Sequence, residues 1–137
     1  MQILFPLFAL FALTLIVAMR LGYLRYSAVA KREVDIRYFK SYDSFDEPEN
    51  LRITSRHQIN LLEMPMLFYV VCILTYVTGQ SGALLISLAW AYVAARLVHT
   101  FIHLGSNIVL WRFRIFGLSI LILTSMWVVL LISIIRN

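Results

Sequence analysis

Apolar residues in this chain are gathered into four long blocks. Residues 3–19 and 116–135 carry no charge, residues 61–78 carry only Glu63, and residues 83–97 carry only Arg96. A helix needs about 20 residues to cross the hydrocarbon core of a bilayer, at a rise of about 1.5 Å per residue. The blocks and their flanks therefore predict four transmembrane helices, at about residues 2–26, 54–78, 83–111 and 115–135, with a cytoplasmic loop at about 27–53.

This pattern predicts an all-α membrane protein, a four-transmembrane-helix bundle that forms a single domain over residues 1–137. The hydrophobic fraction of 61% exceeds the roughly 45–50% that is typical of soluble domains. The alternative for the first block is a cleaved signal peptide. That alternative is disfavoured because no basic stretch precedes the block and no clear small-residue cleavage site follows it.

The distribution of basic residues predicts the orientation in the membrane. Of the 12 lysines and arginines, eight lie between Arg20 and Arg56, and the connection at residues 79–82 has none. Because cytoplasmic loops carry the excess of basic residues, we expect the first and third connections to be cytoplasmic and both termini to face the periplasm or lumen. The net charge of +5 is then an orientation signal. It does not indicate nucleic-acid binding, since no basic stripe alternates with aromatic residues.

Three polar residues open the second apolar block. Arg56, Asn60 and Glu63 are spaced i, i+4, i+7 and therefore share one helix face. Carrying a carboxylate into lipid costs several kcal/mol. Another helix, a cavity or a ligand must therefore receive this face.

The third block carries a complementary set. Arg96, His99 and His103 are spaced i, i+3, i+7, and the tight turn at residues 79–82 makes the second and third helices antiparallel neighbours. Counting about 1.5 Å per residue from that turn brings Glu63 and Arg96 to one level. An interhelical salt bridge would explain these two residues alone. The whole set exceeds one pair and also suits a small zwitterionic or anionic ligand at the cytoplasmic membrane face.

A metal site at His99 and His103 is a further alternative. The i, i+4 spacing suits a shared metal, but the chain lacks a His-Glu-x-x-His pattern. We therefore expect no metal ligands. The single cysteine, Cys72, lies inside the second apolar block and is expected to be a buried thiol. His57 is expected at the membrane interface.

The Arg-x-x-x-Asn-x-x-Glu motif at the start of a second helix, in a four-helix membrane protein of this length, resembles the MAPEG family. The run from Ala95 to His103 is similar to the family's arginine followed by aromatic positions, and the resemblance covers essentially the whole chain. It is nearest to short bacterial members, which implies an integral protein of the bacterial inner membrane. It also implies a homotrimer that binds glutathione between subunits near the cytosolic face.

By this resemblance, six residues would bind the glutathione co-substrate: Arg56, Asn60, Glu63, Arg96, His99 and His103. The two histidines depart from the family, whose characterised members often have tyrosine there. Catalysis needs an ionised thiol, which a nearby guanidinium favours. The expected catalytic residues are Arg112, which the sequence places between the third and fourth helices, and Arg25. Arg20 is a further candidate, and membrane-interface anchoring is the alternative role for each.

Two functions remain open on the sequence. The first is a glutathione-dependent transferase or peroxidase acting on a lipophilic small molecule that arrives from the bilayer. The second is a non-catalytic, lipid-binding or accessory subunit of a larger membrane complex. The histidines at positions where the family often has tyrosine support this alternative.

Overall fold

The computed structural model describes residues 1–42 and 47–136. Its elements are α1 (Leu4–Ala30), α2 (Tyr38–Ser41), α3 (Glu49–Val77), α4 (Ala83–Leu104) and α5 (Val109–Ile135), with no strand in these two ranges. All except α2 are long and apolar enough to cross a membrane. The all-α fold with four membrane-spanning helices is therefore confirmed.

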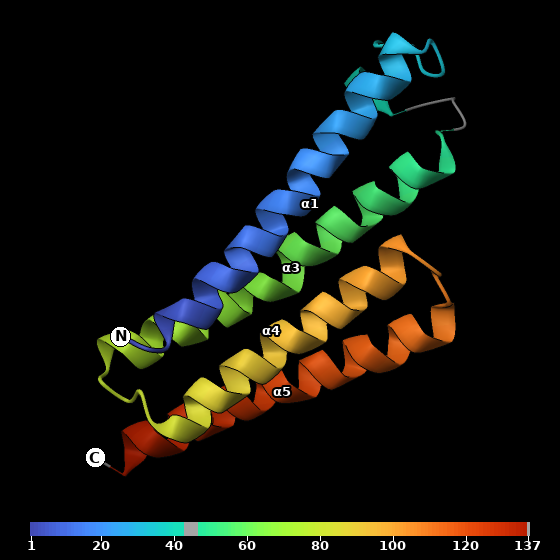
Figure 1. Cartoon of the computed structure of the whole chain (residues 1–137). Coiled ribbons are helices and arrows are strands. Elements are labelled where there is room, and N and C mark those ends of the chain that lie inside the picture. The colour runs from blue at the N-terminus through green and yellow to red at the C-terminus, as the bar shows by residue number, and fades with distance from the viewer. Residues whose placement is uncertain (43–46, 137) are drawn as a thin grey trace.

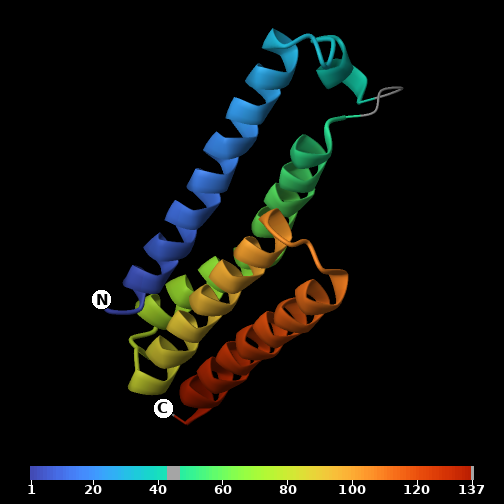
Figure 2. The ribbon, with the colours of Figure 1, turned by 45° about the vertical axis from the view of Figure 1, so that its right-hand side comes forward.

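The helices are arranged as two pairs. α1 packs mainly against α3, and α4 packs mainly against α5 (Figures 1 and 2). The pairs meet where α4 contacts α1 and α3 and where α5 contacts α3, whereas α1 and α5 do not touch within the described residues. Both termini lie at one end together with the α3–α4 turn, and the other two connections lie at the opposite end (Figure 1).

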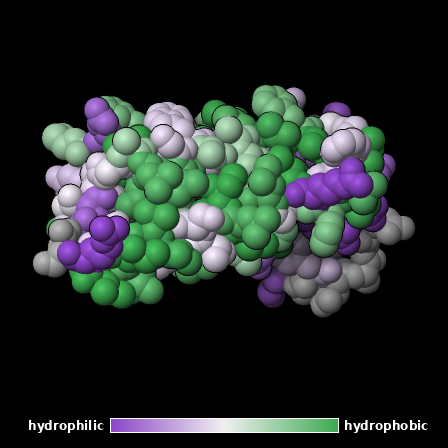
Figure 3. Space-filling model, turned by 90° about the horizontal axis from the view of Figure 1, so that it is seen from below, coloured by the Kyte–Doolittle hydropathy of each residue, from purple (hydrophilic) through white to green (hydrophobic). Residues whose placement is uncertain are grey.

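The core lies along the seam where the pairs meet. Phe68 of α3 and Tyr92 of α4 stack there with ring centroids 4.6 Å apart. Cys72 is fully buried beside them in the same cluster, as expected for an apolar thiol. Large apolar side chains remain exposed on the outer faces, and Figure 3 shows an apolar middle with hydrophilic residues toward both ends. A bilayer suits such a surface.

Several helix ends differ from the sequence-based ranges. α1 continues to Ala30, α3 begins at Glu49, and α4 ends at Leu104 where the pattern suggested residue 111. Gly105 ends α4: its φ and ψ are both −104°, and a Cβ there would lie 2.7 Å from the carbonyl oxygen of Phe101. α5 then starts at Val109, so Arg112 belongs to its first turns and not to a connection.

Candidate functional site

Polar side chains gather at the end of the seam that is opposite the chain termini. Around the α3 axis, Asn60 lies between His57, which faces α4, and the outward-facing Arg56 and Glu63. α4 presents Arg96, and both of its histidines, to α3 because residues three and four apart share a helix face.

Arg96 of α4 is fully buried, with no exposed surface. Its Nη2 donates a hydrogen bond to the main-chain carbonyl of Asn60 at 2.9 Å, and its guanidinium lies 5.8 Å from the centroid of the Phe116 ring. Nε and Nη1 have no partner among the described residues. Arg96 therefore joins α4 to α3 within one turn of Glu63 and does so without an ion pair.

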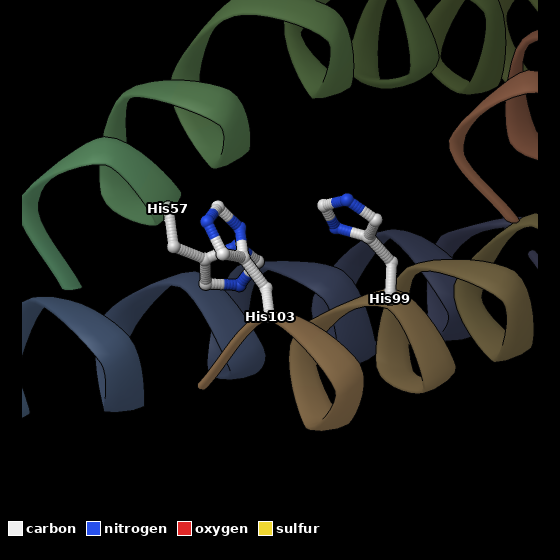
Figure 4. Close-up of side chains that lie close together, drawn as sticks. All are labelled: His57, His99 and His103. Carbon is white, nitrogen blue, oxygen red and sulfur yellow. The ribbon is translucent and has the colours of Figure 1, made fainter. Parts of the chain in front are cut away.

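The histidines form a buried group, which we call the histidine cluster: His57, His99 and His103 (Figure 4). Nδ1 of His57 lies 3.0 Å from Nδ1 of His103, and Nε2 of His57 lies 2.9 Å from Oγ1 of Thr100. His57 has no exposed surface, so it is buried between helices within the chain, and the membrane-interface position expected for it stays a prediction. Its side chain points into the seam because α4 offers it polar partners there.

A cavity of about 240 Å³ opens beside the cluster, between α3, α4 and α5. Its polar lining comes from Asn60, His99 and Arg112, and its apolar lining from Val109, Phe113 and Phe116. Arg112 is held by a 2.7 Å hydrogen bond from its Nη1 to Oδ1 of Asn107. The three polar side chains give the cavity hydrogen-bonding groups on an otherwise apolar wall.

The remaining candidates lie elsewhere in the isolated chain. Arg56 and Glu63 are exposed on the outer side of α3. Arg25 lines a different hollow, between α1 and α3, where its guanidinium lies 5.7 Å from the centroid of the Phe39 ring. Arg20 is exposed at the edge of an apolar groove between α1 and α4. One chain therefore brings Asn60, His99 and Arg112 together and leaves these four apart.

Three residues of this region were given no role on the sequence, although Thr100 and Asn107 lie close to the polar face of the third helix by spacing. They are His57, Thr100 as its hydrogen-bond partner, and Asn107 as the anchor of Arg112. A signal existed for Asn107. It follows Gly105-Ser106 and has φ of +51°, a backbone conformation in which asparagine is enriched, so the tripeptide is a helix-stop signal. No local signal distinguishes a buried His57 from an exposed one.

Comparisons with curated proteins and with solved structures gave no match. The sequence matches the MAPEG family over residues 3–132, nearly the whole chain. Glutathione transferases and peroxidases belong to this family, as do non-catalytic members. Because this match spans nearly the whole chain, and because the chain has four membrane-length helices, it belongs to the MAPEG family.

Proposed function

We propose that this protein is a glutathione-dependent transferase or peroxidase that acts on a lipophilic substrate in the membrane. The observation that carries the proposal is the cavity in which Asn60, His99 and Arg112 meet. Family membership supports glutathione as the ligand of such a cavity.

The chemistry of the side chains fits glutathione, which has two carboxylates, one ammonium group and a thiol. Arg112 and Arg56 suit the carboxylates because guanidinium groups bind them through charge-assisted hydrogen bonds. Glu63 suits the ammonium group. Since a guanidinium also stabilises a thiolate, Arg112 is our first candidate for activating the thiol. Arg112 lines the cavity, and its Nε has no partner among the described residues.

The exposed positions of Arg56 and Glu63 support a shared site. A carboxylate at this depth of a membrane helix is costly unless it is paired or wet, yet Glu63 is exposed in the single chain. We infer that a neighbouring subunit covers this face in a homotrimer and that glutathione binds at the junction. Arg25 would then reach a bound thiol only from a neighbouring copy, because its own hollow lies on the α1 side of α3.

In this proposal Arg96 and His103 do not contact the ligand directly. Both are at most 1% exposed and neither lines the cavity. Arg96 holds the Asn60 carbonyl and underlies Phe116, so we assign it a positioning role. His99 lines the cavity and is the histidine we expect to contact the ligand.

The reaction follows from the thiolate. Its sulfur attacks an electrophilic carbon of the substrate and expels the leaving group as an anion. With a hydroperoxide, the sulfur attacks the terminal oxygen, so that an S–O bond forms as the O–O bond breaks and the alkoxide leaves to be protonated to the alcohol. A second glutathione then reduces the sulfenic acid, which gives glutathione disulfide and water. Phe113, which lines the cavity, is itself 75% exposed, so the cavity borders the apolar outer surface. A lipophilic substrate can therefore approach from the bilayer without crossing water.

Isothermal titration of the purified full-length protein with glutathione tests the proposal. Binding is expected, and Glu63→Gln should weaken it by roughly 10- to 100-fold, because a charge-assisted hydrogen bond contributes about 1.5–3 kcal/mol. Glu33→Gln is the matched control, since Glu33 is an exposed carboxylate in the α1–α2 connection. Absence of binding at millimolar glutathione, with the helical fold intact, would refute the proposal.

Two observations favour the second candidate, a non-catalytic lipid-binding or accessory subunit. Arg112 is already hydrogen-bonded by Asn107, and His99 stands where characterised members often have tyrosine. Under that alternative, glutathione would bind without turnover of electrophiles or lipid hydroperoxides, or would fail to bind at all. A transferase and peroxidase assay on glutathione-binding protein separates the two functions.

A further inference from the structure

All 3 histidines of the chain meet in the histidine cluster, although they come from two helices. His57 lies on α3, whereas His99 and His103 lie on successive turns of α4 (Figure 4). Each is at most 3% exposed. Because buried ring nitrogens need hydrogen-bond or metal partners, such a cluster has to be accounted for atom by atom.

The nitrogen separations are those of a metal site that is nearly assembled. One ring nitrogen from each histidine lies within 4.8 Å of the other two, and the His57 and His103 Nδ1 atoms are 3.0 Å apart. Tetrahedral zinc with Zn–N bonds of about 2.0–2.1 Å places its nitrogen ligands about 3.3 Å apart. The pair therefore already has ligand spacing, and a ring movement of at most about 1.5 Å, from 4.8 Å to about 3.3 Å, would bring in His99.

Hydrogen bonding fixes the tautomer of His57 in the form that a metal needs. The Thr100 hydroxyl donates its one hydrogen to the main-chain carbonyl of Arg96 at 2.8 Å. It must therefore accept from Nε2 of His57, 2.9 Å away. The lone pair of His57 then lies on Nδ1, directed at His103. Metal-binding histidines are held in this way, with the second ring nitrogen donating to a nearby oxygen.

His99 supplies an independent indication. Its Nδ1 is buried and has no hydrogen-bond partner among the described residues, although the other two rings lie close by, each with its centroid 5.5 Å from that of His99. A purely structural cluster would leave this nitrogen unsatisfied. A metal ion bound by the cluster would give Nδ1 of His99 a partner, because this nitrogen would coordinate the ion.

We propose that His57, His99 and His103 form a three-histidine binding site for a zinc-class transition-metal ion. Imidazole nitrogens suit Zn²⁺ and copper, whereas Mg²⁺ and Ca²⁺ prefer oxygen ligands. Three protein ligands leave one coordination position for water or an anion. A hydroxide or other anion there would offset the charge of Arg96, which lies one turn before His99 and is buried. The inference does not depend on glutathione binding.

The test is a Co²⁺ titration of full-length protein that carries a tag without histidine and has been stripped of metal by a chelator. Visible absorption typical of tetrahedral Co²⁺ should saturate at one ion per chain, and Zn²⁺ should abolish it. His99→Ala should remove the signal. Thr100→Val, which lacks only the hydroxyl, should weaken binding by about 10- to 100-fold, as for other partners of metal-bound histidines.

Glu33→Gln controls for metal bound at exposed carboxylates and should bind Co²⁺ like the unmodified protein. His99→Gln, which keeps a polar side chain in the cluster, replaces His99→Ala if the alanine variant loses its helical circular dichroism. The proposal is wrong if the unmodified protein gives no saturable Co²⁺ spectrum, or if the folded His99 variant gives the same spectrum and affinity.

Discussion

Replacing Arg96 with methionine should stabilise the protein while it weakens glutathione binding. The buried guanidinium leaves Nε and Nη1 without partners among the described residues, and each unsatisfied group costs about 1–3 kcal/mol. Desolvating the charge adds to this cost. On the favourable side are the hydrogen bond to Asn60, which contributes about 1.5–3 kcal/mol, and the Phe116 contact, which contributes about 0.5–2 kcal/mol.

An apolar side chain of similar length removes both the unfavourable burial of the guanidinium and its favourable contacts with Asn60 and Phe116. Replacing buried charged groups in this way often raises the free energy of unfolding by about 1–4 kcal/mol, and we expect Arg96→Met to fall in that range. Binding should weaken by about 1 kcal/mol, roughly fivefold, because the Asn60 carbonyl is no longer held.

The assay is denaturant unfolding in detergent at fixed protein concentration, followed by circular dichroism, with glutathione titration alongside. Arg114→Met is the matched control. Arg114 lies on the same protein end but is exposed, 5.3 Å from the centroid of the Trp111 ring, and its loss should change neither quantity much. If Arg96→Met destabilises the fold by more than about 2 kcal/mol, the guanidinium is satisfied in the native protein and the reasoning fails.

Two further predictions concern the helix ends and the orientation. Gly105→Ala should lower the free energy of unfolding by about 1–3 kcal/mol because the added Cβ would lie 2.7 Å from the carbonyl oxygen of Phe101 and force the backbone to shift. Gly117→Ala, with nothing within 4 Å of the added Cβ, should be neutral or stabilising in thermal unfolding. Equal effects would contradict this account of the α4 end. A membrane-impermeant thiol reagent added to intact cells should label Ser81→Cys and spare Glu33→Cys, since basic connections face the cytoplasm. The native Cys72 is buried and keeps the background labelling low. The reverse labelling pattern would overturn the predicted topology.

The spans and the facing polar sets were predictable because their causes are local. A block such as residues 116–135 needs no tertiary information to be a membrane helix, since burial of apolar side chains in lipid depends on composition. Helical periodicity also put Arg96 and His99 on one face, and Arg96 does reach α3 at Asn60.

The rest depended on relations that one sequence does not contain. The burial of His57 is decided by how α4 is rotated against α3, because only that rotation brings Thr100 to its Nε2. The separation of Arg25 from Arg112 follows from which helices pair. Glu63 is exposed in the single chain, so the packing of the four helices does not specify what its carboxylate meets.

The seam between the helix pairs also bears on how the chain enters the membrane. Inserted alone, α4 carries Arg96 into hydrocarbon, at a cost of about 2.5–3.5 kcal/mol for an arginine at the helix centre. Asn60 contacts Arg96, and His57 contacts Thr100. Both Asn60 and His57 lie on α3, which is synthesised before α4. Leaving the translocon together as an antiparallel pair would let α3 and α4 form these two hydrogen bonds before lipid surrounds them. Biogenesis would thus favour release of the two helices as one unit, with the short turn at residues 78–82 keeping them adjacent.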